Sequence, residues 1–121
     1  MNSTAMRAID ESAIARLRRF GGAKLISAMV TAFLKDAPMR LATARHHADA
    51  GDAAGVRREL HSLRSSAGQL GALAMQELCA AGEELAANGF TPTLIETVRN
   101  VTREFDVVEE ELAALRDAPI A

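Results

Sequence analysis

The sequence predicts an all-α protein, an antiparallel up-down four-helix bundle with a short additional helix at its N-terminus. Apolar residues recur three and four positions apart through most of the 121-residue chain, as on one face of an amphipathic helix. Short Gly- and Pro-containing stretches separate these segments, and such connections favour antiparallel neighbours. No segment shows the apolar–polar alternation of a strand. The length suits one domain with one core.

The composition excludes several kinds of partner. The formal net charge is −2 and the chain has no Trp or Tyr, so nothing indicates binding to nucleic acid or a membrane surface. Cys79 is the single cysteine, which excludes an internal disulfide and favours a reducing cytoplasm. No apolar run could span a bilayer, and the first residues lack the apolar core of a signal peptide. We expect a cytoplasmic, monomeric domain without direct membrane contact.

The first half of the chain is expected to hold a tail and two helical segments. Residues 1–9 form the tail, and Asp10 caps a short helix that ends at Gly21-Gly22. In the second segment, Pro38 cannot donate a helical hydrogen bond, which predicts a kink or break close to Asp36. The residues expected to be buried there are Leu25, Met29 and Phe33, with Ile26, Val30 and Leu34 beside them.

Three further helices complete the bundle, which is expected to span residues 10–117, with 118–121 as a C-terminal tail. Asp52 caps the central helix, and Gly71 marks the turn after it. The next helix ends at Asn88-Gly89, and Thr91-Pro92 begins the last one. The inward residues expected between these stops are Met75, Leu78, Cys79, Leu85 and Ala86.

The central stretch, Val56 to Gly71, carries the side chains best suited to chemistry. Its apolar stripe consists of Val56, Leu60, Leu63, Ala67 and Leu70. At about 100° per residue, His61 lies well off this stripe and faces solvent. The residues that project near it are Arg57, Arg58, Arg64, Ser65 and Gly68.

His61 is the candidate nucleophile, because a neutral imidazole can accept a group that another protein delivers. Phosphoryl transfer needs positive charge beside the equatorial oxygens, which Arg64 can supply from one turn along the helix. Ser65 and Gly68 keep the surface low enough for another domain's active site to reach the ring. If the next helix folds back, Glu83 can accept from Nδ1–H and leave Nε2 free, with Glu84 as the neighbouring alternative.

The residues His61-Ser62-Leu63-Arg64-Ser65-Ser66, followed by Leu70-Gly71-Ala72, resemble the signature of histidine-containing phosphotransfer (HPt) domains. In that family the phosphorylated histidine precedes Leu-Lys-Gly-Ser and then Leu-Gly-Ala. The likeness extends through Leu78 and Cys79 to Glu83, where the family usually has Leu-Glu. It also takes in Phe33 and the Ala-Gly-Asp at 50–52, and so covers most of residues 10–90.

The resemblance implies a phosphocarrier of multistep phosphorelays. His61 would accept a phosphoryl group from the aspartyl phosphate of a receiver domain and pass it to another response regulator. The Mg²⁺ would belong to the receiver, so we expect no metal or cofactor in this chain, and without a Gly-rich phosphate loop no kinase activity. Arg57 and Arg58 are either solvated or, with Ser65 and Gly68, part of a docking surface for the receiver.

Three positions depart from the family pattern. Arg64 replaces Lys, which keeps the charge and changes its geometry, and Ser65 replaces Gly, which crowds the approach slightly. Gly82 replaces the Leu before Glu83, which weakens that helix by about 1 kcal/mol relative to Ala.

Several alternatives stay open at this point. The module stands alone or is the C-terminal HPt domain of a hybrid sensor histidine kinase, and it would be membrane-tethered only in the second case. Another class of function is a helical-bundle interaction module that binds a partner without phosphorylation. A third is an enzyme with His61 as general base, for which the sequence shows no pocket or partner acid.

Overall fold

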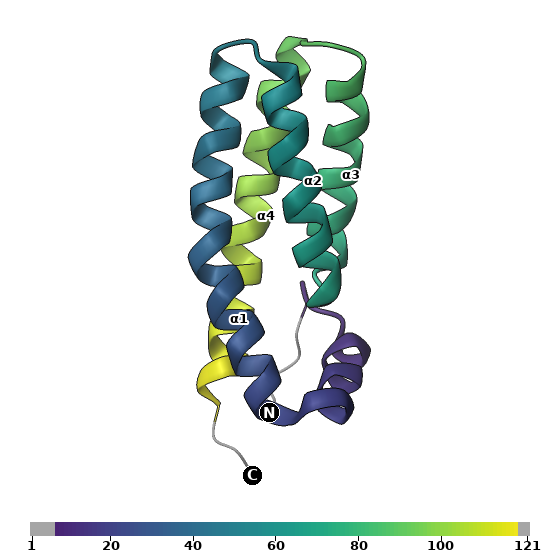
Figure 1. Cartoon of the computed structure of the whole chain (residues 1–121), viewed down its shortest axis with the longest axis vertical. Helices are drawn as coiled ribbons and strands as arrows, with labels where there is room; N and C mark the ends of the chain where they lie inside the picture. Colours follow the sequence, from purple (N-terminus) through teal and green to yellow (C-terminus); the bar gives the residue numbers. More distant parts are fainter. Residues whose placement is uncertain (1–6, 119–121) are drawn as a thin grey trace.

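The computed structural model describes residues 7–118 and contains four helices in an up-down bundle (Figure 1). They are α1 (Glu11–Asp49), α2 (Ala53–Gln69), α3 (Leu73–Ala87) and α4 (Pro92–Asp117). No strand occurs in this part of the chain, so the predicted fold class is confirmed. The predicted N-caps Asp10, Asp52 and Thr91 all precede a helix.

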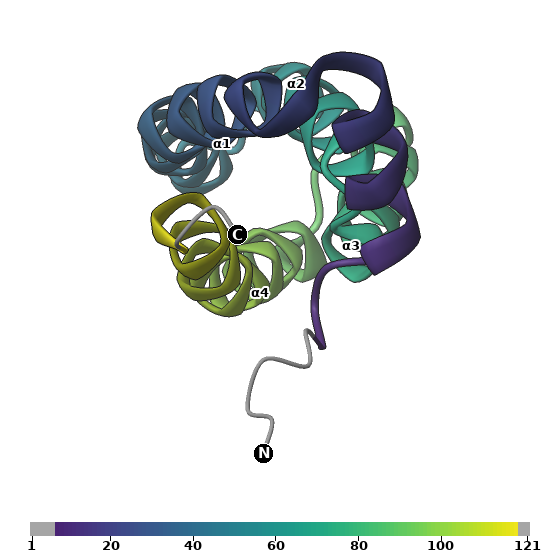
Figure 2. The ribbon, with the colours of Figure 1, turned by 90° about the horizontal axis from the view of Figure 1, so that it is seen from below.

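The helices form a closed ring, in which α2 packs on α1 and α3, and α4 packs on α3 and α1 (Figure 2). The core between them is apolar, and Phe33 of α1 meets Phe105 of α4 edge to face with ring centroids 5.8 Å apart. Apolar residues recur every three to four positions along α4. Leu115, the last of them, is partly buried, and the others are buried: Leu94, Val98, Val101, Phe105, Val108 and Leu112.

Helix α1 bends sharply at Gly22, whose φ of 72° and ψ of −173° lie outside the helical region. Residues 11–21 therefore form a separate arm that crosses the end of the α2–α3 hairpin (Figures 1 and 2). The backbone N–H of Asp10 donates to the carbonyl of Gly71 in the α2–α3 turn at 2.8 Å. The arm is the short additional helix that the sequence predicts.

The predicted break near Asp36 is wrong, because α1 continues through Pro38 and no neighbouring residue leaves helical geometry. A proline inside a helix costs about 3 kcal/mol. Ala37 and Leu41, which flank Pro38, are both buried in the core, and their packing holds the two turns together.

Two other expectations about the core need correction. On α1 the buried line is Ile26, Val30 and Phe33 instead of Leu25, Met29 and Phe33. Two apolar lines run side by side there, about 100° apart, and periodicity alone does not select between them. On α3, Leu78 is only partly buried and Leu85 is 38% exposed, while Gly82 and Glu83 take inward positions.

The last three residues of the expected N-terminal tail are held on the bundle. The backbone N–H groups of Arg7, Ala8 and Ile9 donate to the Glu111 carboxylate at 3.0–3.2 Å, and the Ile9 side chain is buried. Such a run of N–H groups makes a concave anion site. Residues 1–6 and 119–121 of the expected tails lie outside the described residues.

None of the helices within residues 7–118 combines the length and apolar character needed to cross a membrane.

Candidate functional site

Helix α2 presents His61 to solvent. Asp52 begins the helix by accepting from the Gly55 backbone N–H at 2.9 Å, and this hydrogen bond is the main reason that the pKa of Asp52 is lowered. Val56, Leu60, Leu63 and Ala67 are buried, as the stripe predicts. The His61 side chain, on the other side of the helix, is 65% exposed.

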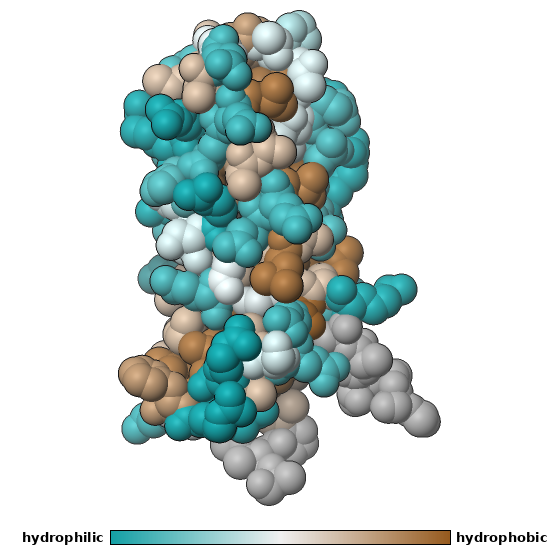
Figure 3. All heavy atoms as spheres, turned by 90° about the vertical axis from the view of Figure 1, so that its right-hand side faces the viewer, coloured by the Kyte–Doolittle hydropathy of each residue, from teal (hydrophilic) through white to brown (hydrophobic). Residues whose placement is uncertain are grey.

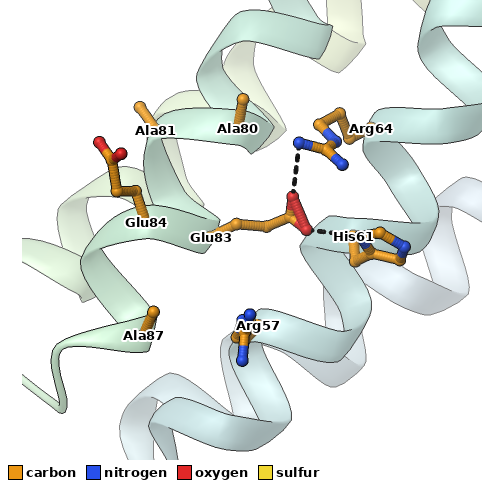
Figure 4. A pocket seen from close by; sticks show the side chains of 8 residues that line it. All are labelled: Arg57, His61, Arg64, Ala80, Ala81, Glu83, Glu84 and Ala87. Atoms are coloured by element: carbon orange, nitrogen blue, oxygen red, sulfur yellow. Dashed lines mark hydrogen bonds and ion pairs between the residues drawn. The ribbon is translucent and has the colours of Figure 1, made fainter.

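Glu83 of α3 lies beside the imidazole (Figure 4). Its Oε1 is 2.7 Å from His61 Nδ1, and its side chain is only 11% exposed. Glu84 lines the same hollow, and Figure 4 shows its carboxylate pointing away from His61. The structure therefore selects Glu83 from the two acids that the sequence left open.

Gly82 explains how α3 comes close enough for this contact. A Cβ built on Gly82 would overlap Leu60 Cδ1 and lie 3.0 Å from Thr97 Cγ2. Leu60 is fully buried directly before His61, so a side chain at position 82 would press on the segment of α2 that carries the imidazole. The glycine that sequence analysis read as a weak point of α3 permits close packing.

Arg64 also binds Glu83, a contact that the sequence did not predict. Its Nη1 forms an ion pair with Glu83 Oε2 at 3.1 Å, and the arginine side chain is 41% exposed. The two carboxylate oxygens are thus divided between the imidazole and the guanidinium (Figure 4). The second ring nitrogen of His61 points away from Glu83, toward the open side of the site.

Two shallow hollows between α2 and α3 meet at His61 and Arg64. Arg57 lines the first hollow, and the small side chains of Ala80 and Ala81 form its α3 wall (Figure 4). Ser65 and Gly68 line the second, opposite Gln76. Sequence analysis missed the contribution of Ala80, Ala81 and Gln76, although all lie within two turns of Glu83 on α3. Arg58, a candidate docking residue, is exposed and lines neither hollow.

The surface around these hollows is open and mixed in character. On the side of the bundle formed by α3, apolar side chains are scattered among polar ones and do not form one continuous patch (Figure 3). Leu73 and Leu85 are the large exposed apolar residues of α3. The site could be covered by another protein, whereas it does not enclose a small substrate.

Cys79 lies one turn before Glu83 and is fully buried. Burial raises the pKa of its thiol to about 12. The thiol is therefore a core group, as its place on the apolar line predicts.

These features define a class of protein: a helical bundle with an exposed histidine that a buried carboxylate supports and that only a visiting domain can cover. The chain matches the model of the Hpt domain family over residues 28–118 and belongs to that family. Hpt domains carry phosphoryl groups on histidine in phosphorelays and interact with the receiver domains of response regulators. The family and function that the sequence motif predicts are confirmed.

A solved structure agrees with this assignment at the level of the fold. The chain is similar to the crystal structure of histidine-containing phosphotransfer protein B (HptB) from Pseudomonas aeruginosa PAO1, with 23% identity and a TM-score of 0.86. The alignment covers 93% of this chain and 96% of that one. No curated protein gave a match.

Proposed function

We propose that His61 is the phosphorylated residue, and that it accepts the group from a receiver aspartyl phosphate and relays it to another response regulator. The observation that carries this proposal is the exposed imidazole with Nδ1 on the Glu83 carboxylate at 2.7 Å. His46 and His47 lie in the last turn of α1, and His47 pairs with Asp52 at the α1–α2 turn.

Glu83 prepares the ring for attack. An ionised carboxylate accepts only, so Nδ1 carries the proton and the Nε2 lone pair is available. As the Nε2–P bond forms, the bond between phosphorus and the aspartyl oxygen breaks and the receiver carboxylate leaves. The ring, which keeps its Nδ1 proton, becomes cationic, and the carboxylate of Glu83 offsets that charge.

The surrounding residues have supporting roles. Arg64 adds positive charge near the position that the phosphoryl oxygens occupy. Ser65 and Gly68 leave room for the receiver, and Arg57 and Arg58 help to dock its acidic rim. The receiver supplies the Mg²⁺, and this chain needs no cofactor of its own.

The chain acts in this proposal as a monomeric cytoplasmic carrier without catalytic activity of its own. Family membership does not favour the alternative of an interaction module that works without phosphorylation. A general base acting on a small substrate would need an enclosed pocket, and the hollows beside His61 are shallow and open.

Phosphotransfer from a labelled receiver tests the assignment. The chain is mixed with phosphorylated receiver domains, and acid-labile label on the bundle is measured for the wild type, His61→Gln and the matched control His46→Gln. We expect label on the wild type and on the His46 variant and none on the His61 variant. Label that survives His61→Gln would overturn the site.

A further inference from the structure

Two arginines flank His61 on the same face of α2, four residues before it and three residues after it. Side chains at these separations are neighbours on a helix. Arg57 and Arg64 both line the hollow beside the ring, as Figure 4 shows. They differ in their partners, because Arg64 forms an ion pair with Glu83, whereas no carboxylate of residues 7–118 lies within ion-pair distance of Arg57.

The contact with Glu83 constrains what Arg64 can do. The Glu83 carboxylate is nearly buried and carries one negative charge, which faces His61 Nδ1 through one oxygen and pairs with the Arg64 guanidinium through the other. Its negative charge offsets much of the guanidinium charge for a dianion that arrives at Nε2. The same contact holds the second carboxylate oxygen, and so keeps the first one aimed at the ring.

Arg57 has the opposite properties. It is exposed, it has no anionic partner among the described residues, and Ala87 lies across the hollow from it (Figure 4). Glu84 also lines this hollow but makes no ion pair with it. A long, uncompensated guanidinium beside the nucleophile can bind two phosphoryl oxygens at once.

We propose that the two arginines divide the work: Arg64 positions the imidazole through Glu83, and Arg57 is a catalytic residue that binds the phosphoryl oxygens during transfer. This inference rests on the proposed function of His61. It assigns Arg57 a direct contact in place of a role limited to docking, and it adds a positioning role to the charge that Arg64 supplies.

The positioning role is tested without any phosphoryl transfer. The ¹⁵N chemical shifts of the His61 ring report which nitrogen carries the proton, at a pH where the imidazole is neutral. We expect the Nδ1–H form to predominate in the wild type, in Arg57→Gln and in the control Arg45→Gln, an exposed position of α1 away from both hollows. Arg64→Gln should raise the Nε2–H fraction, and Arg64→Lys should restore part of the wild-type balance. An unchanged tautomer balance in Arg64→Gln would overturn the positioning role.

The direct contact of Arg57 is tested with phosphoramidate, a small phosphodonor that requires no docking of a receiver. Its P–N bond breaks and ammonia leaves as the Nε2–P bond forms. We expect Arg57→Gln to slow labelling of His61 about tenfold, the effect of losing one charge-assisted contact in the transition state. Arg57→Lys should retain most of the rate. The control Arg45→Gln, at an exposed position of α1 that lines neither hollow, should label like the wild type.

Equal labelling rates for Arg57→Gln and Arg45→Gln would overturn the role of Arg57. In that case His61 would still be labelled in both variants, and its own assignment would stand. Thermal unfolding of each variant, followed by circular dichroism, checks that these exposed substitutions leave the bundle folded.

Discussion

Replacing Gly82 with alanine tests how closely α3 must approach α2 for Glu83 to reach His61. On an exposed helix surface this change stabilises a protein by about 1 kcal/mol, because alanine has the higher helix propensity. Here the new methyl group would overlap Leu60 Cδ1 and lie 3.0 Å from Thr97 Cγ2. Leu60 is fully buried, so its side chain cannot move out into solvent to make room. Overpacking of this kind costs about 1–3 kcal/mol.

The net expectation for Gly82→Ala is a destabilisation of about 1 kcal/mol, which lowers Tm by about 4 °C in a domain of this size. Circular dichroism during heating measures it. Gly68→Ala is the matched control, because its methyl group would overlap only the amide end of Gln76, a partly exposed side chain that can rotate away. The control should keep or exceed the wild-type Tm. A Tm for Gly82→Ala at or above that of the wild type would refute the close-packing argument.

Three further outcomes are expected. Asp52→Ala removes the N-cap of α2 and should lower Tm by about 4 °C in thermal unfolding. Because the folded state lowers the pKa of Asp52 from 3.8, this stabilisation is present above that pH and is lost as pH falls through the folded value, so wild type and variant should converge in acid. Cys79 should resist Ellman's reagent at pH 8 until the protein is unfolded, since the thiol is buried and its pKa is about 12; rapid reaction of the folded chain would contradict this. Glu111→Ala should speed amide hydrogen exchange at Arg7–Ile9, measured by NMR, and leave phosphorylation of His61 unchanged.

Local signals in the sequence were sufficient for most of the fold. Asp10 and Asp52 mark helix starts because the hydrogen bond that each side chain accepts lies within one turn. Thr91-Pro92 marks the start of α4 because proline suits the first helical position. The exposure of His61 also follows from spacing alone, since it lies off the apolar stripe of α2. These features depend on neighbours within a few positions along the chain.

Features that depend on how the helices pack against each other could not be predicted from the sequence. Helix α1 carries two adjacent apolar lines, and its packing against both α2 and α4 buries Ile26 and Val30. The hydrogen bonds from the backbone of Arg7–Ile9 to Glu111 join residues that are more than a hundred positions apart. The apolar spacing around Pro38 was visible, but the strength of its packing was not.

In the site, too, some features follow from local sequence and others from helix packing. Which of Glu83 and Glu84 meets His61 depends on how α3 is rotated against α2, and the small side chain of Gly82 allows the observed packing. The ion pair between Arg64 and the same carboxylate follows from that rotation. No motif within α2 could therefore have predicted this ion pair.

The contact between the N-terminal arm and Gly71 affects the rate of phosphotransfer through His61. Gly71 has a φ of 78°, and a Cβ there would lie 2.8 Å from Ala13 Cβ, so the arm clasps the hairpin at its bend. This contact therefore helps to fix how α2 and α3 are aligned along their length. The same alignment places Glu83 beside His61. A change that breaks the hydrogen bond from Asp10 to Gly71 is therefore expected to slow phosphotransfer, although every reacting group would remain in the chain.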